Sequence, residues 1–168
     1  MKTSDETFIV ISPSEPINQT SFLLRSGIKK VIGNGFQSEF SKAHISLMKY
    51  HDTHRDSLLY HFDSIVSHFK PFKIFLKDFE ILHHGSNRTI CFNIINKPAI
   101  QEIFYSLTGK NITPHITIAR SLSKEDFDKV WPLMQNITYS NHFLCSHLTV
   151  LKGGPGSWHH YMNLSLYN

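Results

Sequence analysis

The sequence predicts an α+β fold in which two pseudo-symmetric lobes of mainly antiparallel sheet, with outer helices, surround a central cleft. Three observations lead to this prediction. Helix-like and strand-like segments alternate along the 168 residues, and several strands are joined by links of hairpin length, which favour antiparallel pairing. Each half of the chain also contains a histidine-bearing strand, then a helix, then a hairpin. A twofold relation between the halves would bring equivalent strands to one cleft, within a single domain spanning residues 1–168.

The first half begins with an alternating strand and a capped helix. Ser14 is the predicted N-cap, Pro16 lies in the first turn and Gly33 ends the helix. Apolar residues then repeat at helical spacing until Pro71, and Gly85 begins a hairpin turn. The predicted elements are a strand at 7–12, a helix at 14–31, a histidine-bearing strand at 42–49, a helix at 53–69 and hairpin strands at 72–83 and 89–95.

The second half continues with the same kinds of element. Gly109 stands at the expected end of a third helix. Ser123 and Asp126 form a capping box that starts a fourth helix, despite Pro132 near its end. The predicted elements are a helix at 98–107, a histidine-bearing strand at 114–118, a helix at 123–134 and strand segments at 139–151 and 159–166.

The composition describes an ordinary globular protein. Hydrophobic residues make up 40% of the chain and charged residues 18%, unlike the balance of a disordered chain. No apolar run approaches the roughly 20 residues that span a bilayer, and no signal-peptide core follows the polar first residues, so we expect a cytoplasmic protein without membrane contact. Cys91 and Cys145 are expected to be reduced, buried thiols. The net charge of +4 mildly favours an anionic partner such as RNA.

Two short strand-like segments carry the strongest functional signal. Each has a histidine and a hydroxyl residue two positions apart: His44 with Ser46, and His115 with Thr117. Side chains at i and i+2 of a strand point to the same face, so each strand presents one imidazole beside one hydroxyl. Taken singly, either pair is more simply structural, because the chain contains 12 histidines and threonine favours strands. Taken together, and brought to one cleft, the two pairs indicate catalysis.

The paired segments resemble the twin signature of the 2H phosphoesterase superfamily. They read HISL and HITI and begin 71 positions apart, and the run PHITIAR at 114–120 is similar to the RNA 2′,3′-cyclic phosphodiesterases once called 2′-5′ RNA ligases. Strands at 8–11 and 148–151 also lie where that family places them, so the resemblance covers essentially the whole chain. It implies a phosphodiesterase with no metal and no cofactor. It also implies His115 as general base and His44 as general acid, with the roles reversed in the opposite reaction.

The residue types suit this reaction on chemical grounds as well. Hydrolysis of a cyclic phosphodiester needs a base to take a proton from water and an acid to protonate the departing ribose oxygen. Histidine can do either near neutral pH, but the residues alone do not decide which of His44 and His115 is the acid. The hydroxyls of Ser46 and Thr117 would donate hydrogen bonds to the nonbridging phosphate oxygens, where negative charge accumulates.

Other residues are weaker candidates for substrate binding. Arg120 ends the second motif, but simple alternation places it opposite His115, so it contacts either a substrate phosphate or another part of the protein. Lys42 shares the parity of the first motif and either lines the cleft or is solvated. Three aromatic residues in or near predicted loops either stack on bases or pack within the protein: Phe36, Phe40 and Trp158.

The sequence leaves alternatives open. The same site could cleave or join 2′-5′-linked oligonucleotides, or the chain could be a noncatalytic module that binds RNA ends or nucleotides. A pure binder would be better served by permanent cations than by groups suited to proton transfer. A metal-dependent hydrolase is disfavoured, because no carboxylate–histidine ligand cluster is evident. The expected partners are RNA ends or cyclic and 2′-5′-linked nucleotides. The oligomeric state stays open, with a monomer favoured.

Overall fold

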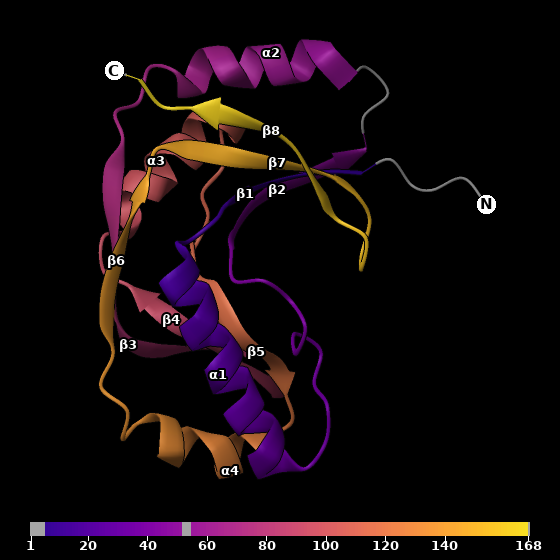
Figure 1. The fold of residues 1–168 in the computed structure, drawn as a ribbon, viewed down its shortest axis with the longest axis vertical. Helices are drawn as coiled ribbons and strands as arrows, with labels where there is room; N and C mark the ends of the chain where they lie inside the picture. The colour runs from indigo at the N-terminus through magenta and orange to yellow at the C-terminus, as the bar shows by residue number, and fades with distance from the viewer. Residues whose placement is uncertain (1–5, 52–54, 168) are drawn as a thin grey trace, which may run out of the picture.

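The computed structural model describes residues 6–51 and 55–167, and in this part of the chain eight strands form one antiparallel sheet (Figure 1). The strands are β1 (Glu6–Ile11), β2 (Ile45–His51), β3 (Phe72–His84), β4 (Asn87–Ile94), β5 (Ile116–Leu122), β6 (Ser140–Cys145), β7 (His147–Gly153) and β8 (His159–Ser165). Their order across the sheet is β6-β3-β4-β5-β2-β1-β7-β8. The histidine strands predicted at 42–49 and 114–118 are observed as β2 and β5, which begin immediately after His44 and His115 and meet at the centre of the sheet. The predicted α+β class and antiparallel pairing are confirmed.

Four helices cover the sheet: α1 (Glu15–Ile32), α2 (Arg55–Val66), α3 (Lys97–Thr108) and α4 (Lys124–Met134). Their ends follow local sequence. Ser123 accepts a hydrogen bond from the Asp126 amide at the start of α4, and Gly33 and Gly109 end α1 and α3 with φ of +77° and +67°, a region that glycine adopts without strain. The predicted start of the second helix, at Thr53, lies outside the described residues.

The two half-sheets are interleaved along the chain. One half-sheet contains β6, β3, β4 and β5, and the other contains β2, β1, β7 and β8. The hairpin β3–β4 thus pairs directly with the second histidine strand, β5, whereas β1 lies between the hairpin β7–β8 and the first histidine strand, β2. The helices cross over too: α1 leaves β1 but packs on β5 and α4, whereas α2 packs on β8 and α3 (Figure 1). The repeated order of elements is present, but each half of the chain contributes to both halves of the sheet.

The strand-like run at 139–151 forms two strands that lie far apart in the sheet order. β6 pairs with β3 at one edge, whereas β7 pairs with β1 and β8 in the other half-sheet. Ser146 separates them, and its carbonyl accepts a hydrogen bond from the Leu166 amide. This segment therefore links the two half-sheets.

The core is continuous and mostly aliphatic, and its burial fixes the side of the sheet that each strand residue faces. Isoleucines of the central strands are fully buried, among them Ile9, Ile45, Ile90 and Ile116. Alternation then turns the residues between them to the other face. Among the described residues, no helix combines the length and the hydrophobicity needed to cross a membrane.

Candidate active site

The two motifs meet where the half-sheets join. Ile45 of β2 lies opposite Ile116 of β5 in antiparallel register. Extending that register by one residue in each direction places His44 across from Thr117, and Ser46 across from His115. The four side chains therefore share one face of the sheet, opposite the buried isoleucines. We call this the motif face.

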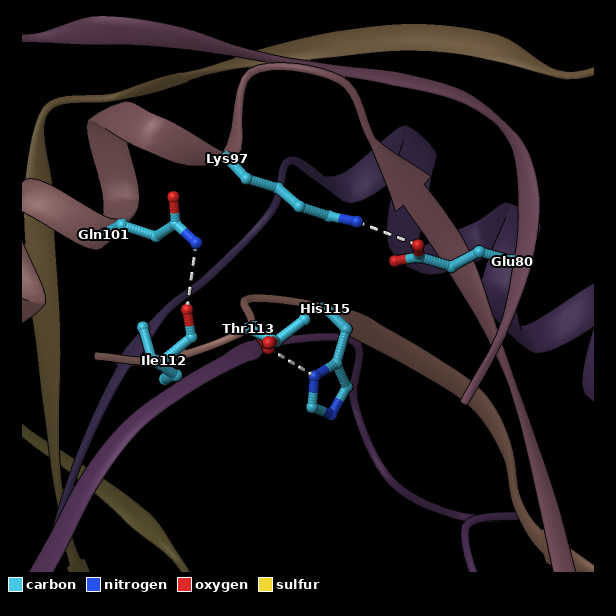
Figure 2. Close-up of polar contacts among 6 residues, drawn as sticks. All are labelled: Glu80, Lys97, Gln101, Ile112, Thr113 and His115. Carbon is cyan, nitrogen blue, oxygen red and sulfur yellow. Dashed lines mark hydrogen bonds and ion pairs between the residues drawn. The ribbon is translucent and has the colours of Figure 1, made fainter. Parts of the chain in front are cut away.

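The two imidazoles are held in the same way. Nδ1 of His44 lies 2.8 Å from the Lys42 carbonyl oxygen. Nδ1 of His115 lies 2.9 Å from the Thr113 carbonyl oxygen, as Figure 2 shows. Because a carbonyl oxygen only accepts, Nδ1 carries the proton in each neutral ring. Nε2 of each histidine is thereby left with a lone pair, in the tautomer that can accept a proton from a reactant.

His44 has the more perturbed environment of the two. Its ring packs edge to face against Phe8, with 5.4 Å between the centroids. Burial lowers the pKa of His44, and the positive charges of Arg25 and Lys49 and the neighbouring His115 lower it further, against an opposing effect of the hydrogen bond to the backbone of Lys42. The neutral form of His44 is therefore favoured near pH 7.

Lys49, Phe8 and Trp158 form a cation–aromatic cluster beside His44. The Lys49 ammonium lies 4.5 Å from the Phe8 ring centroid and 5.3 Å from that of Trp158, and the two rings are 5.3 Å apart. Simple alternation would turn Lys49 away from Ser46. An irregularity between β1 and β2 pairs Val10 with Ser46 and Phe8 with Lys49, which places the lysine on the motif face. The sequence marks this shift only by the adjacent apolar residues Leu47 and Met48, which interrupt the alternation.

A row of polar side chains continues from Thr117 across the next two strands. Cys91 is paired with Thr117 and Glu80 with Cys91, so the three side chains share the motif face. Lys97, at the start of α3, forms a 2.8 Å ion pair with Glu80 (Figure 2). Burial and then the charge of Glu80 raise the pKa of Cys91 to about 12, so this thiol stays protonated and is a poor nucleophile.

A β-bulge in β5 places Arg120 on the motif face. Thr117 pairs with Cys91, but Ala119 pairs with the adjacent Ile90, so β5 contains an extra residue at this point. Alternation beyond Ala119 then places Arg120 on the same side as Thr117, and its charge acts on the pKa of Cys91. The simple alternation applied to the sequence fails here because it cannot include the bulge.

Lys42 occupies a different place from that of the motif side chains. It is exposed and precedes β2, and it lines a hollow of about 590 Å³ between α1 and the following loop, together with Phe22, Arg25 and Phe40. Neither motif histidine lines this hollow. The contact of Lys42 with the histidine site is made by its backbone carbonyl.

Arg25 is a buried residue next to the site that the sequence analysis did not identify. From α1, its Nη2 donates to the Thr117 carbonyl at 2.9 Å, its Nε donates to the Ile118 carbonyl at 3.0 Å, and its Nη1 donates to the Ser41 carbonyl. Three carbonyl acceptors compensate the desolvation of the guanidinium. A signal was available, because Arg25 falls within the buried stripe of α1, which otherwise contains Ile17, Ser21, Ile28 and Ile32.

Ser38 and Gln101 make further polar contacts with the motif segments. Ser38 donates to the Ile118 carbonyl at 3.1 Å and accepts from the Arg120 amide at 2.9 Å. Gln101 of α3 donates to the Ile112 carbonyl at 3.1 Å (Figure 2). Within the described residues, no group of three or more His, Cys, Asp or Glu side chains is arranged to hold a metal ion.

Solved structures of phosphoesterases share this fold. E. coli LigT in its apo form matches with a TM-score of 0.66 and 12% identity, over 99% of this chain and 100% of LigT. LigT complexed with 3′-AMP matches with a TM-score of 0.67 and 13% identity, over 98% of this chain and 99% of LigT. Usb1 of Kluyveromyces marxianus matches with a TM-score of 0.54 and 14% identity, over 98% of this chain and 99% of Usb1. No curated protein is significantly similar in sequence.

A family model extends the relationship beyond the fold. The model of the 2′-5′ RNA ligase superfamily matches residues 33–156, a range that contains His44 and His115 together with both hydroxyl residues. The match covers well over half of the chain, and the structural matches belong to the same group of enzymes. The chain therefore belongs to the 2′-5′ RNA ligase superfamily, within the 2H phosphoesterases.

Proposed function

We propose that this protein is a metal-independent phosphodiesterase that hydrolyses 2′,3′-cyclic phosphates of RNA ends or nucleotides by two-histidine general acid/base catalysis. The observation that carries the proposal is the register at Ile45 and Ile116, which gives the two motifs a common face. The matching orientation of the two imidazoles supports it, because both have Nδ1 bound to a carbonyl and Nε2 available for proton transfer.

The proposed reaction is a displacement at phosphorus. His115 Nε2 takes a proton from water as the water oxygen bonds to phosphorus. The bond from phosphorus to one ribose oxygen breaks, and a protonated His44 Nε2 gives its proton to that oxygen. Ser46 and Thr117 donate hydrogen bonds to the nonbridging oxygens, which gain charge in the transition state. The acid and base roles follow the family resemblance and reverse in the opposite reaction.

The need for protonated His44 is compatible with its lowered pKa. Burial and neighbouring positive charge favour neutral imidazole in the free protein. A bound phosphodiester brings a negative charge beside the ring and so favours the imidazolium. Substrate binding would thus favour protonation of His44, which then donates this proton to the departing ribose oxygen.

The nucleotide complexes of a relative support the substrate class. LigT has been crystallised with 3′-AMP and with phosphate. On this chain, an equivalent nucleotide would place its phosphate between the histidines and meet Arg120 and Lys49 on the same face. We propose both residues as substrate contacts, because they add positive charge to the motif face.

The test is hydrolysis of a 2′,3′-cyclic nucleotide by purified protein in the presence of EDTA. We expect turnover to persist with EDTA and to fall at least ~10²-fold in His44→Ala and in His115→Ala. His83→Ala, which changes an exposed histidine at the end of β3, is the matched control. Turnover that EDTA abolishes, or that either motif substitution leaves intact, would disprove the mechanism.

The family description favours a second candidate, which is cleavage or joining of 2′-5′-linked oligonucleotides at the same site. Product analysis separates the two activities. Incubation with a 2′-5′-linked dinucleotide would release nucleosides or nucleotides only if that bond is the substrate. Saturable nucleotide binding without turnover of either substrate would instead identify a noncatalytic binding module.

A further inference from the structure

The helix that precedes each motif strand contacts the main chain just before the motif histidine. In α1, Arg25 Nη1 donates to the carbonyl of Ser41, three residues before His44. In α3, Gln101 Nε2 donates to the carbonyl of Ile112, three residues before His115, at 3.1 Å (Figure 2). The two contacts occupy equivalent places in the repeated order of strand, helix and histidine strand.

Each contact is continuous with the hydrogen bond that orients the imidazole. The carbonyl after Ser41 belongs to Lys42 and accepts from His44 Nδ1 at 2.8 Å. The carbonyl after Ile112 belongs to Thr113 and accepts from His115 Nδ1 at 2.9 Å. Consecutive carbonyls lie in adjacent rigid peptide planes, and only the φ and ψ angles of the intervening residue separate them. Fixing the first carbonyl therefore limits the directions open to the second.

These segments need side-chain anchors because the sheet holds them weakly. β2 and β5 begin only after the histidines, and a single residue pair, Ile45 with Ile116, joins the two strands. Backbone groups near the histidines therefore lack the ladder that fixes the rest of the sheet. Arg25 spans the junction, since its Nη2 and Nε donate to Thr117 and Ile118 of the opposite motif strand.

We propose that Arg25 and Gln101 are a matched pair of positioning residues, each of which fixes the main chain that orients one of the two motif histidines. The inference rests on the proposed two-histidine function. A purely structural role predicts lost stability with unchanged chemistry in the folded molecules. A positioning role predicts a larger change at one histidine than at the other. Gln101 contacts only the segment before His115. Arg25 contacts the segment before His44, whereas its bonds to Thr117 and Ile118 lie beyond His115 in β5, which β4 also holds.

The experiment compares Arg25→Met and Gln101→Met, which remove the donors and keep much of the side-chain volume. Lys30→Met on α1 and Glu102→Met on α3 are matched controls, because both residues are exposed. Kinetics with a 2′,3′-cyclic nucleotide give kcat and KM. Two-dimensional ¹H–¹⁵N spectra of the imidazoles report the tautomer of each histidine without requiring turnover.

We expect each donor variant to lower kcat about 10- to 10²-fold with KM changed less than about threefold, because small displacements of a catalytic group have costs of this size. Arg25→Met should perturb the Nδ1-protonated tautomer of His44 more than that of His115, and Gln101→Met should do the reverse. Controls should match the unaltered protein. Folded variants with unchanged kcat and unchanged imidazole spectra would overturn the proposal, as would equal perturbation of both histidines by either change.

Arg25→Lys covers the case in which Arg25→Met does not fold. Lysine keeps the charge but cannot donate to three carbonyls in the planar arrangement of a guanidinium. We expect this folded variant to show the same selective change at His44 with a smaller loss of kcat, and an unaltered His44 signal would contradict the inference. If the unaltered protein shows no turnover, the proposed function fails, and the imidazole spectra still decide the roles of Arg25 and Gln101.

Discussion

Ile45 and Ile116 lie directly opposite each other at the junction of the half-sheets, and each immediately follows a motif histidine. Both isoleucines are fully buried. Because side chains alternate along a strand, burying these two residues turns the histidines toward the opposite face. Core packing and the geometry of the candidate site therefore depend on the same residue pair.

Truncating Ile116 should lower stability strongly. We expect Ile116→Ala to reduce the free energy of unfolding by about 2–5 kcal/mol and Ile116→Val by about 0.5–1.5 kcal/mol, because a larger cavity forms in the first case. Urea denaturation followed by circular dichroism measures both. A loss below about 1 kcal/mol for the alanine variant would show that the junction repacks freely.

The two motif hydroxyls should matter for kcat more than for stability. Ser46→Ala and Thr117→Val remove donors that we place on the nonbridging oxygens, and each should lower kcat about 10- to 10²-fold, somewhat less than the loss of an oxyanion-hole donor in a protease. Thr117→Ser keeps the hydroxyl and should retain most activity. Steady-state kinetics on a cyclic nucleotide measure kcat for each variant. Equal losses of kcat in Thr117→Val and Thr117→Ser would exclude a role for the hydroxyl.

Much of the fold could be predicted because local signals and core burial agree. The cap at Ser123 and the stops at Gly33 and Gly109 lie where the sequence places them. A fully buried isoleucine follows each motif histidine, so two-residue alternation turns His44 and His115 away from the core without knowledge of the partner strands. Such predictions depend only on neighbours along the chain.

The parts that could not be predicted depend on pairing between distant strands. The bulge at Ile118 moves Arg120 to the motif face, and the irregular pairing of β1 with β2 does the same for Lys49. Each shift coincides with two adjacent apolar residues, Leu47–Met48 and Ile118–Ala119, but such a pair does not by itself identify a bulge. Interleaving of the half-sheets also places Arg25 of the first helix against β5, ninety-two residues from Thr117, whose carbonyl it binds.

His44 should titrate below the usual histidine range. Burial lowers its pKa, and Arg25, Lys49 and His115 add to the effect while the Lys42 backbone opposes it. We expect Lys49→Met to raise the pKa of His44, and saturating inorganic phosphate to raise it in the unaltered protein. NMR titration of the imidazole carbons measures both shifts. Unchanged titration with phosphate would contradict anion binding beside His44.

The same lowered pKa gives stability a defined pH dependence. The unfolded protein binds a proton at His44 near pH 6.5, whereas the folded protein binds it only at lower pH. This contribution to stability is fully present above about pH 6.5 and is lost as the pH falls through the folded pKa. We therefore expect His44→Gln to lose less stability than the unaltered protein between pH 7.5 and 5.5, measured by urea denaturation. An identical loss of stability in His44→Gln and the unaltered protein would contradict a lowered pKa of His44 in the folded state.

The two thiols should be inert in the folded protein. Burial raises the pKa of both Cys91 and Cys145 to about 12, and the charge of Glu80 adds to this effect for Cys91. Thiolate is therefore scarce at pH 8. We expect a chromogenic disulfide reagent to modify no thiol in the native protein within minutes and both thiols in guanidinium chloride. Rapid modification of a native thiol, with loss of activity, would show that Cys91 is accessible from the motif face.

Trp158 should report the binding of a nucleobase. Its ring lies against Phe8, which contacts His44, and the Lys49 ammonium lies over both rings. A base stacked on Trp158 would displace Lys49 from the aromatic faces and free the ammonium for the phosphate, and such stacking is worth about 1–3 kcal/mol per base. In a Trp131→Phe background Trp158 is the one remaining tryptophan of the chain. We expect its emission to change with a nucleoside 3′-monophosphate and to stay constant with ribose 3-phosphate, which lacks the base.

Kinetics provide the matching measurement. Trp158→Leu should raise KM for a 2′,3′-cyclic nucleotide about 5- to 10²-fold, which is the factor that the stacking energy implies. It should leave KM for ribose 2,3-cyclic phosphate unchanged, because that substrate has no base to stack. Lys49→Met, which removes a proposed phosphate contact, should raise KM for both substrates. Equal effects of Trp158→Leu on the two substrates would show that Trp158 packs against the protein and does not bind the base.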